Sequence, residues 1–99
     1  MDIKTESIHF TADQKLIDYV EKKVGKLEQF FDKIIDGIVT LRLENSGQIK
    51  DKIVDIKLNV PGETIFISES NKTFEAAVDA GVAVMKRQLL KYKDGLKGR

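Results

Sequence analysis

Two stretches of the chain have the hydrophobic spacing of amphipathic helices, and the first lies near the N-terminus. Its apolar side chains recur every three or four residues, at Leu16, Val20, Val24, Leu27, Phe31 and Ile34. This spacing puts them on one stripe and predicts a helix over about residues 12–33. Thr11 and Gln14 have the spacing of a capping box at its start. Glycine at position 25 costs about 1 kcal/mol relative to alanine inside a helix, and the pattern gives no reason for it.

The second stretch lies at the end of the chain. Its apolar positions are Phe74, Val78, Val82, Met85, Leu89 and Tyr92. We expect this helix to begin around Asn71, because asparagine is a good N-cap residue. We expect it to end near Gly95, because glycine is favoured just past the C-terminus of a helix.

Elsewhere apolar and polar residues alternate, which is typical of strands with one buried face. The alternation predicts strands over residues 2–8, 38–44, 52–60 and 64–69. The side chains expected to face inward from the middle two strands are Val39, Leu41, Leu43, Val54, Ile56, Leu58 and Val60. The segments 45–48 and 61–62 are turn sequences, so the strands that they join are expected to be antiparallel.

The predicted order is therefore β-α-β-β-β-α. Each helix has one apolar stripe to bury, and the alternating strands leave one apolar face to cover. We therefore expect an α+β fold, a four-stranded sheet with both helices packed on one face. The 99 residues are enough for one such domain, spanning residues 1–99.

The composition offers little equipment for catalysis. The chain has no cysteine and one histidine, His9, at a predicted strand end, so disulfides and thiolate metal sites are excluded. It has neither a nucleophile-elbow serine nor a glycine-rich phosphate loop. We expect no enzyme activity, cofactor, metal or small-molecule substrate. No apolar run approaches the roughly 18 residues of a membrane span, and the first ten residues lack a secretion signal, so we expect a cytoplasmic protein with no membrane partner.

The net charge of +1 conceals a basic end. Residues 86–99 hold six of the 17 basic residues and one of the 16 acids, which leaves this segment at +5 and the rest at −4. A basic end is typical of nucleic-acid binding. Cations at the end of a helix also complement its dipole, so charge alone leaves both interpretations open.

The first predicted helix is sorted by the sign of its charges. At about 100° per residue, one ridge on the side away from the core carries Lys15, Lys22, Lys26 and Lys33. Between this ridge and the core edge lie Lys23, Tyr19 and Phe30. The opposite flank carries the acids Asp18, Glu21, Glu28 and Asp32. The lysine ridge fits a phosphate backbone or a plain solvated face, and we expect the two aromatic rings at the core edge. If the helices lie side by side, the ridge and the basic end merge into one surface.

The residues also resemble those of a known family. Residues 9–32, HFTADQKLIDYVEKKVGKLEQFFD, are similar to the first helix of the ribosome hibernation factors, the family of hibernation-promoting factor and ribosome-associated inhibitor A. Three shorter motifs match in order, V-P-G at residues 60–62, A-A-x-D at 76–79 and R-Q-L-x-K at 87–91. The resemblance covers essentially the whole chain.

The resemblance implies the same fold and a function. Members bind the small ribosomal subunit between its head and body, in the channel used by mRNA and by A- and P-site tRNA, and hold the ribosome idle in stationary phase or stress. Their contacts run mainly from basic side chains to rRNA phosphates. Carried over by position, the implied RNA-binding residues are Lys22, Lys23, Lys26, Lys86, Arg87, Lys91, Lys93 and Lys97.

Two departures from the family pattern refine this expectation. The chain lacks the C-terminal dimerisation domain of long members and the extended tail of ribosome-associated inhibitor A. We therefore expect a monomer that needs a separate ribosome modulation factor to pair ribosomes. Glu75 stands where many relatives have an aromatic residue, which puts the start of the second helix in question.

An alternative is a protein-interaction module of the same fold that docks through its open sheet face, with Phe66 in a contiguous apolar patch. It predicts little response to salt. An enzyme, the third possibility, would need a deep pocket.

Overall fold

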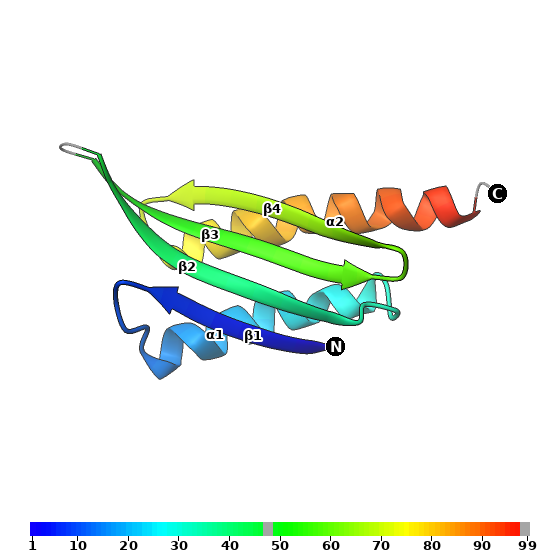
Figure 1. Cartoon of the computed structure of the whole chain (residues 1–99), viewed down its shortest axis with the longest axis horizontal. Coiled ribbons are helices and arrows are strands. Elements are labelled where there is room, and N and C mark those ends of the chain that lie inside the picture. Colours follow the sequence, from blue (N-terminus) through cyan, green and yellow to red (C-terminus); the bar gives the residue numbers. More distant parts are fainter. Residues whose placement is uncertain (47–48, 98–99) are drawn as a thin grey trace.

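The elements follow the hydrophobic periodicities of the chain. The computed structural model describes residues 1–46 and 49–97. In chain order the elements are β1 (Asp2–Ile8), α1 (Gln14–Gly25), the 3₁₀ helix η1 (Lys26–Gln29), β2 (Asp36–Ser46), β3 (Ile49–Val60), β4 (Glu63–Asn71) and α2 (Phe74–Lys97). The predicted order β-α-β-β-β-α is confirmed (Figure 1).

The four strands form one sheet in the order β1-β2-β3-β4. β1 runs parallel to β2, whereas β2 with β3 and β3 with β4 are antiparallel. Parallel neighbours need a crossover connection, and the segment containing α1 provides it. α1 and α2 cover the same face of the sheet (Figure 1), so the expected α+β architecture is confirmed.

The core lies between this face and the helices. Val54, Ile56 and Leu58 of β3 are fully buried, as the alternation predicted. In the sheet register Ile56 lies between Val39 of β2 and Ile67 of β4, which are buried too. Leu43 was predicted to face inward, but its side chain is 47% exposed. The reason is that β2 runs past the helices at this end (Figure 1).

α1 begins later than its pattern predicted. The side chain of Asp13 accepts a hydrogen bond from the amide of Leu16 at 2.8 Å, which makes Asp13 the N-cap residue. The predicted capping box of Thr11 and Gln14 is therefore wrong. Gln14 lies inside the helix and donates to the carboxylate of Asp18 at 2.8 Å. Thr11 and Asp13 are both of residue types that can cap a helix. Only the direction from which the chain enters the helix decides between them.

α1 also ends earlier than predicted. The α-helix stops at Gly25 and tightens into η1, so it does not reach residue 33. Phe31 and Ile34 are buried all the same, because the irregular segment after η1 stays against the core. A methyl group on Gly25 would meet no atom within 4 Å, so lack of space does not explain this glycine.

α2 differs from its prediction at both ends. Its N-cap is Thr73, whose hydroxyl accepts a hydrogen bond from the amide of Ala76 at 3.1 Å. Asn71, the predicted N-cap, is instead the last residue of β4. Gly95 lies within the helix, which continues to Lys97.

The predicted turn at Pro61 and Gly62 joins β3 to β4. Gly62 has a φ of 85°, in the region that glycine reaches without steric cost. The other predicted turn, residues 45–48, includes residues 47 and 48, which lie outside the described residues.

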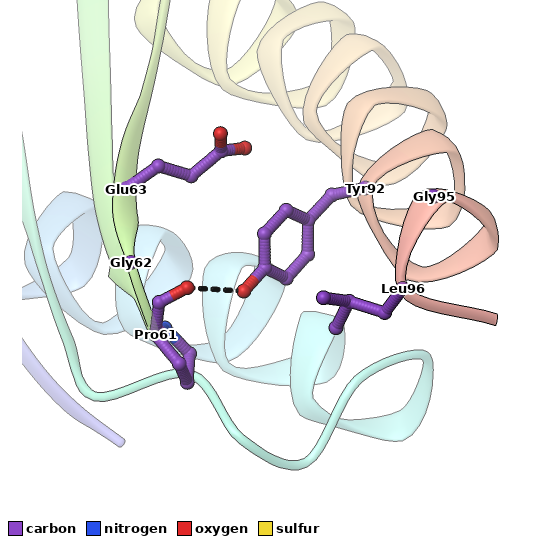
Figure 2. A pocket seen from close by; sticks show the side chains of 6 residues that line it. All are labelled: Pro61, Gly62, Glu63, Tyr92, Gly95 and Leu96. Atoms are coloured by element: carbon purple, nitrogen blue, oxygen red, sulfur yellow. Dashed lines mark hydrogen bonds between the residues drawn. The ribbon is translucent and has the colours of Figure 1, made fainter. Parts of the chain in front are cut away.

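The C-terminal part of α2 is anchored to the β3–β4 turn. The hydroxyl of Tyr92 donates a hydrogen bond to the carbonyl of Pro61 (Figure 2). The Tyr92 ring also meets Phe31 edge-on, with ring centroids 5.4 Å apart. Beyond this anchor the last residues of α2 extend past the sheet (Figure 1).

Candidate nucleic-acid interface

α1 and α2 touch through a polar cluster on the outer side of the helix layer. The hydroxyl of Tyr19 donates to a carboxylate oxygen of Asp79 at 2.7 Å. The ammonium of Lys23 lies 3.9 Å from the same oxygen and 5.5 Å from the centroid of the Tyr19 ring. The cluster therefore brings a lysine of the first helix to the surface of the second.

A second contact crosses between the helical segments further along. The ammonium of Lys86, on α2, lies 4.3 Å from the centroid of the Phe30 ring, which directly follows η1. We call the line of contact made by Tyr19, Lys23, Phe30, Asp79 and Lys86 the helix seam. The seam therefore holds one predicted lysine from each helix, Lys23 from α1 and Lys86 from α2.

A shallow hollow lies beside Phe30 at the end of the seam. Its volume is about 440 Å³, and its lining includes Lys33 from the segment after η1 and Lys93 from α2. We call it the Phe30 hollow. It brings a third lysine of the predicted set, Lys93, next to the first helical segment.

The other predicted cations lie outside the seam. Lys22, Lys26, Arg87 and Lys91 are all exposed. At about 100° per residue, Lys91 points about 140° away from Lys86 around α2, so it lies on a different flank of that helix. The side chain of Lys97 lies outside the described part of the chain.

Most of these cations have no acidic partner among the side chains that the structure describes. Among the side chains that the structure describes, ion pairs within 4.0 Å involve the Met1 amino group, Lys4, Lys23 and Arg42. The predicted cations without a carboxylate in this range are Lys22, Lys26, Lys86, Arg87, Lys91 and Lys93. An exposed cation without an internal partner keeps its full charge for an external anion.

The lysine ridge is shorter than predicted. The prediction continued an α-helical rotation through Lys33, but α1 ends at Gly25 and Lys33 lies in the Phe30 hollow. Asp32, placed on the acidic flank by the same rotation, lines this hollow as well. Glu28, placed on the same flank, pairs with the Met1 amino group at 3.2 Å and also lines the Phe30 hollow with Lys93 of α2.

The two aromatic rings lie where the sequence predicted. Tyr19 and Phe30 are partly buried and pack against the edge of the core. The hydrogen bond to Asp79, helped by burial and by the charges of Asp79 and Glu75, raises the pKa of Tyr19 from 10.0 to about 12. The phenol is therefore neutral at physiological pH and acts as a hydrogen-bond donor.

Sequence reasoning missed the link made by Asp79. In the sequence Asp79 stands out only as part of the A-A-x-D motif, and its partner Tyr19 is 60 residues away in the chain. No local pattern connects residues so far apart. An acid in the first turns of a helix also suits the helix dipole, which explained Asp79 without the contact.

The remaining surface offers little for catalysis or metal binding. Within residues 1–46 and 49–97, no group of three or more His, Cys, Asp or Glu residues is arranged to hold a metal ion. His9 is exposed in the connection after β1, with a φ of 65°. The hollow between the β3–β4 turn and α2, lined by Tyr92, Glu63 and Leu96, has a volume of about 350 Å³ and lies open at the surface (Figure 2). No helix in the described ranges is both long and apolar enough to cross a membrane.

Polar side chains cross the open face of the sheet. Asp55 accepts hydrogen bonds from Arg42 at 2.9 Å and from Ser68 at 2.6 Å. Thr64 donates to Asn59 at 2.8 Å on the other side of Phe66. Phe66 is 60% exposed, but these polar neighbours flank it along β4, so the contiguous apolar patch that a protein-docking face requires is not seen around it.

Comparison with known proteins agrees with the fold and with the sequence resemblance. Residues 3–97 match the family described as Sigma 54 modulation protein / S30EA ribosomal protein. The ribosome hibernation promoting factor of Klebsiella oxytoca is 40% identical over 80 residues, which cover 81% of this chain and 80% of that protein.

Two solved structures have the same architecture. A ribosomal subunit interface protein from Coxiella burnetii superposes with a TM-score of 0.85 at 24% identity, over 95% of this chain and 99% of that one. The N-terminal domain of Thermus thermophilus Protein Y gives a TM-score of 0.80 at 26% identity, over 93% and 99% of the two chains. A match along nearly the whole chain, a close relative and a shared fold show that the chain belongs to the Sigma 54 modulation protein / S30EA ribosomal protein family.

Proposed function

We propose that this protein is a ribosome hibernation factor. It binds rRNA of the small ribosomal subunit in the channel used by mRNA and tRNA and blocks translation sterically in stationary phase or stress. The observation that carries the proposal is the helix seam, where Lys23 of α1 and Lys86 of α2 each contact the other helical segment. The name of the Klebsiella oxytoca relative, a ribosome hibernation promoting factor, supports the choice of target.

The physical basis of binding is phosphate contact. Each lysine or arginine that approaches an rRNA phosphate releases condensed counterions, which favours binding at low salt. Phosphate contacts orient a protein on folded RNA without reading its sequence. A long molecule, measuring 49 × 26 × 18 Å, with cations along one helix layer and beyond the end of the sheet, fits a channel walled by RNA.

The proposed RNA-binding residues contribute in different ways. Lys23, Lys86 and Lys93 lie at the seam or the hollow next to it, where one RNA strand can meet all three. The flanking contacts are assigned to Lys22, Lys26, Arg87, Lys91 and Lys97. Because these flanking residues spread over both helices, the protein would touch RNA on more than one wall.

Inhibition by this route requires no chemistry. The protein would act as a monomer by occupying space that mRNA and tRNA need, and pairing of ribosomes would require a separate modulation factor. The two hollows described above are shallow and open, which is consistent with a surface that binds a large partner instead of enclosing a small one.

Co-sedimentation with purified small subunits at two salt concentrations tests the proposal. About five phosphate contacts predict a fall in affinity on the order of a few hundred-fold between about 50 and 200 mM monovalent salt. Large subunits serve as the control, and mRNA bound beforehand should compete. Absence of binding at low salt, or binding that salt does not change, would contradict the proposal.

A further inference from the structure

We infer that Phe30 is a positioning residue for RNA binding, because its ring holds the ammonium of Lys86 at the helix seam without cancelling its charge. The inference rests on the proposed function and concerns how the surface is organised. It assigns a role to an aromatic residue that itself carries no charge.

α2 and the core edge hold the two partners of this contact. Lys86 is on α2, and its ammonium lies 4.3 Å from the Phe30 centroid, within the range of a cation–π interaction. Phe30 packs against the core edge, and its neighbour Phe31 is buried and meets Tyr92 of α2 edge-on. The ring therefore has little freedom to move, whereas Lys86 is exposed to solvent and open to an anion.

The chemistry of the partner distinguishes Lys86 from Lys23. Lys23 lies 3.9 Å from the carboxylate of Asp79, so an acid inside the protein already attracts its ammonium. Phe30 is neutral and attracts the ammonium through the quadrupole of its ring. Lys86 is thus both held in place and uncompensated among the described residues, whereas Lys22 and Lys26 are exposed without such a support.

A lysine that is already held in place binds RNA more tightly, because a free lysine side chain must be ordered on binding and this ordering costs free energy. A long flexible side chain loses rotamer freedom when it contacts a phosphate. The Phe30 ring has already restricted Lys86 before RNA arrives. Losing this preorganisation should weaken binding about threefold to tenfold.

The surroundings of Phe30 suit this role. The same ring lines the Phe30 hollow with the cations Lys33 and Lys93 and with the acids Glu28 and Asp32. Lys86 above the ring and these two lysines beside it come from α2 and from the segment after η1. Because two acids balance the two lysines of the hollow, Lys86 is the cation here that the ring holds ready for an RNA backbone following the seam.

A double-mutant cycle on small-subunit affinity tests the inference. The variants are Phe30→Leu, Lys86→Ala and the combination of both. Phe30→Leu should weaken binding about threefold to tenfold in the parent protein and hardly at all in the Lys86→Ala background. Lys86→Ala should lower the slope of log affinity against log salt by about one, whereas Phe30→Leu should leave that slope unchanged.

Two further variants separate positioning from mere packing. Phe30→Tyr keeps the ring face and should bind like the parent protein. Lys22→Ala, a matched lysine without an aromatic support, should show no coupling to Phe30→Leu. Melting temperatures of all variants establish that they are folded during the assay. If Phe30→Leu is not folded, Phe30→Met, which preserves apolar volume without a ring, completes the same cycle.

The outcomes are distinct. If the parent protein binds but loss of the ring weakens binding equally with and without Lys86, Phe30 is only structural and the inference is wrong. A change in salt slope for Phe30→Leu would also overturn it. If the parent protein itself does not bind small subunits, the proposed function fails, which is a different result.

Discussion

Tyr19 and Asp79 show how one hydrogen bond joins parts of the chain that are distant in sequence. The bond, 2.7 Å long, links α1 to α2, and it raises the pKa of Tyr19 to about 12. The raised pKa means that the folded protein favours the protonated phenol. The stabilisation from this bond is therefore fully present below the unfolded pKa of 10.0 and is lost as the pH rises through about 12.

Comparison of the parent protein with Tyr19→Phe measures this loss. The free energy of unfolding from urea titrations should favour the parent protein at pH 8, and the difference should shrink steadily between pH 10 and 12. A gap of constant size from pH 8 to pH 12 would show that the bond to Asp79 does not stabilise the fold.

At the scale of the elements, the interiors of helices and strands followed the pattern of the sequence, whereas their ends did not. The period of a hydrophobic stripe is a local property that many residues share. A helix end depends on one capping hydrogen bond, and several residues near each end are able to make it. Thr73, and not Asn71, is the N-cap of α2, because β4 continues through Asn71 and pairs it with Lys52 of β3.

Alanine substitutions at Thr73 and Asn71 test which of the two residues caps α2. Thr73→Ala should lower the free energy of unfolding by about 1 kcal/mol, because the amide of Ala76 loses its hydrogen-bond acceptor. Asn71→Ala, at the position that the sequence favoured, should cost less. Urea denaturation of both variants gives the comparison, and an equal or larger effect at Asn71 would contradict the assignment of the cap.

At the scale of the whole molecule, the two faces carry cations in different ways. On the helix side, Lys86 and Arg87 have no acidic partner among the described residues. On the sheet side, Lys4 lies 3.2 Å from Glu6 and Arg42 lies 2.9 Å from Asp55. A partner that recognises only the total charge of the protein would respond equally to charge changes on either face. An RNA held by the helix layer would respond mainly to changes on the helix side.

Charge reversal on each face separates these cases. Lys86→Glu with Arg87→Glu should abolish binding to small subunits at moderate salt, because two phosphate contacts become repulsive. Lys4→Glu with Lys57→Glu changes the net charge by the same amount on the sheet face and should leave binding nearly intact. Both pairs lie at exposed positions, so melting temperatures should change little. Equal losses from the two pairs would show that the helix layer is not the interface.

The candidate site could be predicted only in part from the sequence. Net charge and helical rotation identified the lysines on both helices, because those quantities depend on residue type and local period. They misplaced Lys33, which lies after the end of α1, and they did not separate Lys86 from Lys91. How each cation is held depends on which side chain of the other helical segment lies next to it.

The sequence by itself determined the type and order of the elements, most of the buried positions of the two central strands and the place of the basic end in the chain, because each of these follows from residues near one another in the chain. Only the tertiary structure decided that Tyr19 meets Asp79 and that Phe30 meets Lys86. Those contacts arise when two helices, each placed by its own apolar stripe, settle side by side on one sheet. Their relative offset is set by the packing of the whole core, which no local pattern records.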